Sequence, residues 1–202
     1  MTGVGHVIYK ADDLAQAVAR FRRQGFDVEY GQPRRPRNAV IYFSTGPYLE
    51  IISGVRMPRA VRAYLRMLGH HRMVAVSDSV AQQPEGYSRI VLEAEREEFA
   101  GLAGICREHG LRTLTPTISR KDVHGRRLSC RCLVPDDWGV PMFVTPFATD
   151  THRGAAHPNG ITRIDQIVFE GSAAAVDICR RSGAGDGLRC RLGAGEISVG
   201  FA

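Results

Sequence analysis

Two polar side chains stand in otherwise apolar segments of this sequence. His6 belongs to the segment GHVIYK (5–10), and Glu50 belongs to YLEII (48–52). A polar group buried without a hydrogen-bond partner costs about 1–3 kcal/mol, so both side chains need a partner or a role. They could simply bond to each other or to backbone groups. On neighbouring strands the pair could also act as a general acid and base, or bind divalent Fe, Mn, Ni, Co or Zn.

Basic side chains form two local groups with different interpretations. Arg120 and Lys121, expected between two strands, could clamp a carboxylate or phosphate, because a guanidinium can bond to two oxygens at once. They could equally be solvated charges that protect a sheet edge. Four arginines recur on one side of a predicted helix and favour a solvated helix face, with an acidic partner as the alternative. These are Arg56, Arg59, Arg62 and Arg66.

Cysteine and the remaining histidine residues give weaker indications. Five cysteines at scattered spacings indicate reduced thiols rather than a disulfide framework. Cys130 and Cys132 share one face of a predicted strand, and without a second cysteine pair we interpret them as small core residues rather than metal ligands. His70 and His71 are expected to be exposed after a helix end. If they lie on a strand, adjacent side chains point to opposite faces, so at most one of them could enter a site.

Composition limits the class of protein. The chain has 202 residues, 44% hydrophobic residues and a net charge of +6, which fits a globular protein that attracts anions. Basic residues are spread along the whole chain, which disfavours nucleic-acid binding. The sequence lacks an apolar run of the roughly 18–20 residues that a membrane span needs, and residues 1–6 lack a secretion-signal pattern. We therefore expect a cytoplasmic protein without membrane contact.

One strand–helix–strands pattern recurs along the chain. Residues 1–54 predict a first βαβββ module, in which Leu14, Ala17, Val18 and Phe21 share one helical face. The predicted strands of this module are 5–10, 26–30, 39–43 and 48–52.

The pattern starts again after a helical linker. Residues 55–88 predict that linker, with a helix over 58–68 and an extra strand at 73–76, and 89–148 predict a second βαβββ module. Its strands are expected at 89–94, 114–118, 126–134 and 141–145. After a second linker (149–160), residues 161–202 predict a partial third module, βαββ. Duplication of a small unit explains this period better than a solenoid.

The order of several short motifs resembles the vicinal-oxygen-chelate superfamily (glyoxalases, bleomycin-resistance proteins and dioxygenases), in its glyoxalase-like branch. The motifs are GHVIY at 5–9, YLEI at 48–51, SRK at 119–121 followed by Gly125, PMF at 141–143 and HPNG at 157–160. The resemblance implies an α+β fold of repeated βαβββ modules, whose curved mixed sheets surround a cup. In such proteins the cup holds a divalent metal and the substrate.

The resemblance also implies a set of candidate site residues. Metal ligands in that superfamily come from the first and last strands of each module, which matches His6 and Glu50 in the first module. In the second module the equivalent positions hold Arg89 and, near the end, Val144, and neither can serve. Gln166 in the third module matches the position of His6 and is the remaining candidate ligand. Tyr48 joins Arg120 and Lys121 as a candidate substrate-binding residue.

These observations predict a glyoxalase-like enzyme that acts on a small oxygenated metabolite, and the net positive charge leaves an anionic metabolite open. The chemistry would be that of an isomerase, lyase or dioxygenase, through a divalent metal or through His6 and Glu50 as an acid–base pair. The alternative is a non-catalytic protein that sequesters a drug or natural product in the same cup. Because the partial third module leaves a sheet edge unpaired, we also expect a homodimer.

Overall fold

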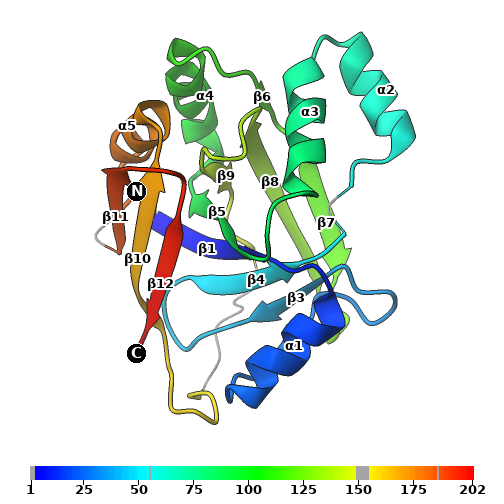
Figure 1. Cartoon of the computed structure of the whole chain (residues 1–202), viewed down its shortest axis with the longest axis vertical. Coiled ribbons are helices and arrows are strands. Elements are labelled where there is room, and N and C mark those ends of the chain that lie inside the picture. Colours follow the sequence, from blue (N-terminus) through cyan, green and yellow to red (C-terminus); the bar gives the residue numbers. More distant parts are fainter. Residues whose placement is uncertain (1–2, 55, 149–154, 186) are drawn as a thin grey trace.

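The chain forms an α+β fold in the computed structural model, which describes residues 3–54, 56–148, 155–185 and 187–202 (Figure 1). The helices are α1 (Leu14–Arg23), α2 (Arg59–Met67), α3 (His71–Val80), α4 (Phe99–Glu108) and α5 (Ala173–Arg181). The strands of the first half are β1 (Gly3–Lys10), β2 (Glu29–Tyr30), β3 (Asn38–Ile41), β4 (Tyr48–Ile52) and β5 (Gly86–Glu93). The later strands are β6 (Thr113–Leu114), β7 (Thr117–Lys121), β8 (Arg127–Pro135), β9 (Met142–Val144), β10 (Ile164–Gly171), β11 (Leu188–Leu192) and β12 (Ile197–Phe201).

The strands assemble into two mixed sheets. Within the described residues, nine strands form one sheet in the order β2-β3-β4-β1-β5-β9-β8-β6, with β7 also paired to β8. The central strand β1 runs parallel to β4 and antiparallel to β5, so the first strands of the two predicted modules join both halves in one sheet. A separate three-stranded sheet has the order β11-β10-β12.

Successive side chains along each strand point to opposite faces of the large sheet. Leu49 and Ile51 of β4 are buried in the main core with Val7 of β1 and the apolar face of α1. That helix begins at Asp13, whose side chain accepts a hydrogen bond from the Gln16 backbone N–H (2.9 Å). The intervening side chains of β1 and β4 are thereby turned to the opposite face, where the candidate site lies.

One prediction for the linker between the two halves is wrong. Residues 73–76 were expected to form a strand, but they belong to helix α3. Met73 and Val74 pack with Leu65 of α2, so one side of α3 is buried and the segment gains helical hydrogen bonds. His71 is the first residue of this helix, and the strand-based argument for the histidine pair is therefore also wrong.

Two further predictions need correction in the second half. The strand expected at 114–118 contains Pro116, and the structure divides it into β6 and β7. Arg120 and Lys121, expected between strands, lie inside β7. In the third segment the order βαββ is present, but β12 pairs with β10 on the side opposite β11.

Part of the predicted linker 149–160 lies outside the described residues, namely 149–154. Within the described part of the chain, the helices are all too short or too polar to cross a membrane.

Candidate functional site

His6 and Glu50 contact each other on neighbouring strands, β1 and β4. His6 Nε2 lies 3.3 Å from Glu50 Oε2, and the two side chains are 7% and 22% exposed. The parallel pairing of β1 with β4 places Ile8 beside Glu50 and His6 beside Tyr48, which brings the imidazole and the carboxylate together. The expected adjacency of the two strands is therefore confirmed.

Two further side chains hold this pair in place. Asn38 Nδ2 donates a hydrogen bond to Glu50 Oε1 (2.6 Å), and the Tyr48 ring stacks on the His6 ring with centroids 4.5 Å apart. His6 Nδ1 is buried and has no hydrogen-bond partner among the described residues. Since an ionised carboxylate only accepts, the proton of a neutral His6 belongs on Nε2, and Nδ1 then carries a lone pair.

Ionisation of Glu50 is favoured by its surroundings. Burial raises the pKa of this carboxyl, but hydrogen bonds from His6 and Asn38 and the nearby Arg120 guanidinium more than offset burial and lower the pKa below its ordinary value. Burial and the adjacent Glu50 carboxylate raise the pKa of Tyr48 well above the ordinary range. At neutral pH the site therefore holds a carboxylate beside a neutral phenol.

The pair lies in the wall of a small cavity, about 100 Å³ in volume. Strands β1, β4, β7, β8 and β9 contribute its walls, so both halves of the large sheet build it. Its lining consists of His6, Ile8, Tyr48, Glu50, Ile118, Arg120, Leu128, Cys130, Cys132, Met142, Val144 and Phe147. Because most of these side chains are apolar, the polar groups are concentrated at the pair and at Arg120.

Arg120 is the cationic group of the cavity. Its Nη1 donates to the backbone carbonyl of Gly31 (2.5 Å), and Gly31 N–H in turn donates to the Asn38 carbonyl (2.9 Å). A Cβ at Gly31 would come within 2.0 Å of Asn38 Oδ1, so the glycine permits the approach of Asn38. Gly31 thus connects the guanidinium to the residue that holds Glu50.

Two predicted site residues are not brought to the cavity. Lys121 follows Arg120 on β7, is exposed, and is absent from the cavity lining, as strand alternation requires. Gln166 lies on β10 of the small sheet. In the side-chain orientation that satisfies both its amide oxygen and its amide nitrogen, the oxygen accepts a hydrogen bond from Arg189 Nη1 at 3.0 Å. The structure therefore groups His6, Glu50, Tyr48 and Arg120, and separates Gln166 and Lys121 from them.

The donor set does not complete a metal site. Catalytic metal sites usually take about three protein ligands, whereas this site offers His6 and Glu50. In the part of the chain that the structure describes, no three His, Cys, Asp or Glu side chains are grouped to hold a metal. Arg89, at the second module's first-strand position, donates to the Val140 carbonyl (3.1 Å) and stacks on Trp138.

Sequence reasoning missed Asn38 and underestimated Cys130. One local signal could have found Asn38, because it is a polar residue at the start of an apolar strand. On β3 it lies two positions before Val40, the residue that pairs with Glu50. Cys130 lines the cavity with Cys132, whose Sγ lies 4.0 Å from Cys130 Sγ. The hydrogen bond from Cys132 lowers the pKa of the Cys130 thiol. Cys132 itself is fully buried with Ile8 and Val144, as expected for a core residue.

Solved structures resemble this fold at low sequence identity. A hypothetical protein from Staphylococcus aureus has a TM-score of 0.53 and 12% identity, covering 85% of this chain and 70% of that protein. The Mn(II)-bound glyoxalase from Novosphingobium aromaticivorans has a TM-score of 0.48 and 13% identity, covering 91% of this chain. A halotolerant catechol dioxygenase has a TM-score of 0.48 and 11% identity, covering 89% of this chain. This chain spans about half of each of those two enzymes, 52% and 53%.

Sequence comparison gives the family directly. No curated protein matches the chain significantly. The sequence model of the family described as "Glyoxalase-like domain" matches residues 4–177, which include both halves of the large sheet and most of α5. The chain therefore belongs to the glyoxalase-like domain family, within the vicinal-oxygen-chelate superfamily.

Proposed function

We propose that this protein is an enzyme that transfers a proton on a small oxygenated metabolite, with Glu50 and His6 as the acid–base pair. The observation that carries the proposal is the contact of a buried imidazole with a carboxylate (3.3 Å) in the wall of a cavity that also holds Arg120. Such reactions belong to the isomerase and lyase classes, and a cavity of about 100 Å³ admits only a small reactive group.

Each polar group has a defined task in this proposal. Glu50, ionised at neutral pH, accepts a proton from a carbon or hydroxyl of the substrate. His6 orients the carboxylate by donating its Nε2–H to Glu50 Oε2, and the proton that Glu50 accepts stays on that carboxyl until it returns to the substrate. Removal of the proton leaves negative charge on a substrate oxygen, and the Arg120 guanidinium in the same cavity stabilises that charge.

Deuterium exchange tests this chemistry without knowledge of the product. Small 2-oxo acids and hydroxyketones are incubated with the protein in D₂O, and NMR measures loss of the proton next to the carbonyl. We expect exchange by the wild type and a loss of about 100-fold or more in Glu50→Gln and His6→Ala. Asp177→Asn is the matched control, since Asp177 contacts His109 (2.8 Å) in a pair that does not line the cavity.

Other outcomes separate the alternatives. Saturable binding of such compounds without exchange would favour the sequestration protein over the enzyme. Stoichiometric Mn, Fe, Ni, Co or Zn in untagged protein, lost in both His6→Ala and Glu50→Ala, would contradict a reaction by protein groups alone. Equal exchange in Glu50→Gln and wild type would remove the proposal.

We also propose a cytoplasmic homodimer. The outer edges of β11 and β12 pair with no strand among the described residues, so a second copy can cover one of them. Light scattering at micromolar concentration tests this proposal, and a monomer there contradicts it.

A further inference from the structure

We propose that the groove between α2 and α3 binds a phosphate-bearing end of the substrate, with an organic pyrophosphate as the chemical class. The groove has a volume of about 750 Å³ and is lined by Arg56, Arg59, Arg62 and Arg66 opposite Asp78. As an assignment of substrate class, this inference rests on the proposed function. The groove itself lies outside the cavity that holds His6 and Glu50.

Helix geometry gathers these arginines on one side of α2. Residues 59, 62 and 66 lie three and four positions apart and share a helical face. Arg56 precedes the helix and lines the same groove. Leu65 packs on Met73 and Val74 of α3, which fixes the two helices as a pair. Arg56, Arg59 and Arg66 are exposed, as predicted for a solvated helix face, and with Arg62 they also line this groove.

Most of the positive charge in the groove is unpaired. Arg62 donates to Asp78 through both terminal nitrogens, with Nη2 2.7 Å from Oδ2. This contact, with further attraction from Arg66 and Arg56, lowers the pKa of Asp78. Within the described residues, no ion pair is formed by Arg56, Arg59 or Arg66. Three guanidinium groups therefore remain available to a ligand that carries several negative charges.

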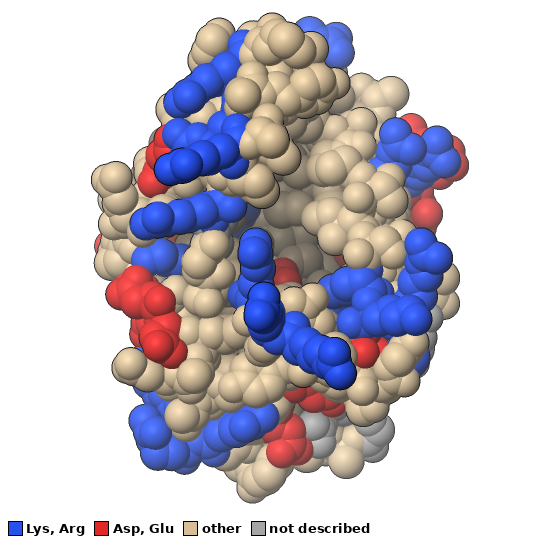
Figure 2. All heavy atoms as spheres, turned by 90° about the vertical axis from the view of Figure 1, so that its right-hand side faces the viewer, with Lys and Arg blue, Asp and Glu red and all other residues tan. Residues whose placement is uncertain are grey.

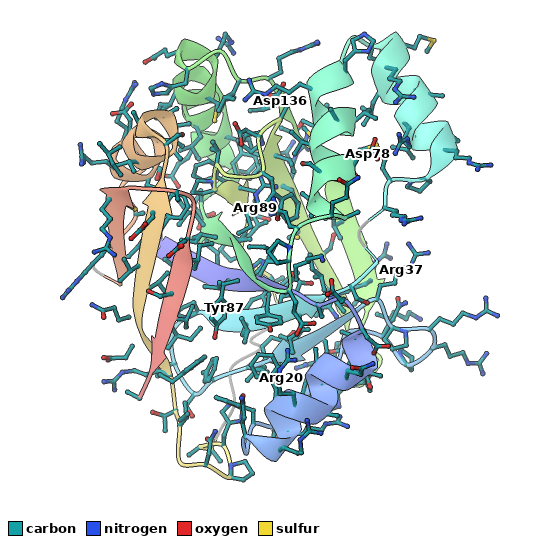
Figure 3. The ribbon with its side chains drawn as sticks, viewed as in Figure 1. Arg20, Arg37, Asp78, Tyr87, Arg89 and Asp136 are labelled. Atoms are coloured by element: carbon teal, nitrogen blue, oxygen red, sulfur yellow. The ribbon has the colours of Figure 1, made fainter. Side chains whose placement is uncertain are left out.

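The pictures show the surroundings of this groove. Asp78 projects from α3 on the side of α2, and Arg37 lies on the same side of the molecule (Figure 3). Figure 2, which looks onto the side with α2 and β7, shows a deep hollow bordered by Lys and Arg side chains. An approaching anion therefore meets positive charge on this face.

A third hollow borders the groove and extends to Asn38, the residue that bonds to Glu50. It has a volume of about 410 Å³ and shares Arg56 and Met57 with the groove. Its lining also includes Arg37 and Asn38, and Asn38 bonds to Glu50 in the cavity wall. The hollow and the cavity share no lining residue, so in the proposed complex a ligand in the groove extends past Arg56 to Asn38, whose side chain bonds to Glu50.

Charge and composition favour a pyrophosphate over the alternatives. A guanidinium bonds to two phosphate oxygens at once, and a pyrophosphate carries enough charge for several of them, whereas a monocarboxylate does not. The described lining of the groove contains no aromatic side chain on which nucleic-acid bases could stack. A volume of about 750 Å³ accommodates the ester as well as its phosphates.

Calorimetric titration with inorganic pyrophosphate tests the groove directly. We expect saturable binding by the wild type and at least about tenfold weaker binding by Arg59→Gln/Arg66→Gln. The control is Arg23→Gln/Arg107→Gln, which removes two exposed arginines of α1 and α4 and the same net charge. Its affinity should stay within about twofold of wild type. Absence of saturable binding, or an equal loss in the control, overturns the proposal.

The same titration separates this inference from the proposed function. Glu50→Gln should bind pyrophosphate as the wild type does, while losing deuterium exchange. Pyrophosphate binding that depends on the groove arginines, in a protein without deuterium exchange, would contradict the enzyme proposal and still support the groove as an anion site. Glu50-dependent exchange without pyrophosphate binding would do the reverse. Tighter, groove-dependent binding of a single-stranded oligonucleotide would replace the pyrophosphate with nucleic acid and overturn the proposed class.

Discussion

Replacement of Asn38 by alanine isolates one contact of the His6–Glu50 pair. The change removes the hydrogen bond from Asn38 Nδ2 to Glu50 Oε1 (2.6 Å) and leaves the backbone pairing of β3 with β4 unchanged. A hydrogen bond to a charged group contributes about 1.5–3 kcal/mol. Because the Glu50 side chain is 22% exposed, water can partly replace the amide, and we expect the lower end, about 1.5 kcal/mol.

This loss should depend on pH in a defined direction. The pKa of Glu50 is lower in the folded protein than in the unfolded chain, so its ionised form contributes stability above the unfolded value. That contribution is lost as the pH falls through the folded pKa. Without the hydrogen bond from Asn38 the folded pKa should rise. Asn38→Ala should therefore be less stable than wild type at pH 7 and nearly equal to it once Glu50 is protonated.

Thermal and urea unfolding from pH 7 down to the lowest pH at which both proteins stay folded measure the effect. At pH 7 the midpoint temperature of Asn38→Ala should fall by roughly 3–6 °C for a chain of this size. An NMR titration of the Glu50 carboxyl should show the higher pKa directly. Equal destabilisation at both ends of the pH range would refute the reasoning, because it would mean that Asn38 acts by packing against Gly31 and not through the carboxylate.

Three further perturbations test the supporting structure. Gly31→Ala should lower the unfolding temperature by several degrees because of its enforced close contact, whereas Gly104→Ala in α4, with open space around it, should be neutral or slightly stabilising. Arg89→Met should cost about 2–3 kcal/mol in urea unfolding and shift the fluorescence of the single tryptophan, on which the guanidinium stacks at 4.7 Å. At pH 8, mass spectrometry should find that iodoacetamide labels Cys130, whose pKa is lowered by its Cys132 hydrogen bond, faster than Cys106, whose pKa burial raises to about 11.

Local pattern was sufficient for much of the fold. The apolar face of α1 was visible in the spacing of Leu14, Ala17, Val18 and Phe21, all of which are buried. Strand β4 was predicted with its observed limits, since an alternating apolar run follows the Gly46-Pro47 turn. Residues 73–76 show where such reasoning ends, because a short apolar run fits a strand or a buried helix equally well. Contacts of Met73 and Val74 with α2 decide in favour of the helix.

The part of the site that depends on a single pair of strands was predictable. His6 and Glu50 meet because β1 and β4 are neighbours in a βαβββ unit, and the family resemblance supplied that pairing. Arg120 reaches the cavity through the β7–β8 hairpin, and its guanidinium bonds to the backbone carbonyl of Gly31, a residue 89 positions away in the sequence. Gln166 was predicted by extending the repeat to the third segment, whose strands instead form their own sheet.

The antiparallel junction of β1 with β5 has a consequence for how recognition can change during evolution. On one side of this junction lie His6 and Glu50, and on the other lie the cavity-lining residues of 118–144. Substitutions in the later half can reshape the cavity opposite the imidazole and carboxylate without altering the strands that carry them. A duplicated gene can therefore acquire a new ligand through mutations in one half while inheriting the imidazole and the carboxylate from the other.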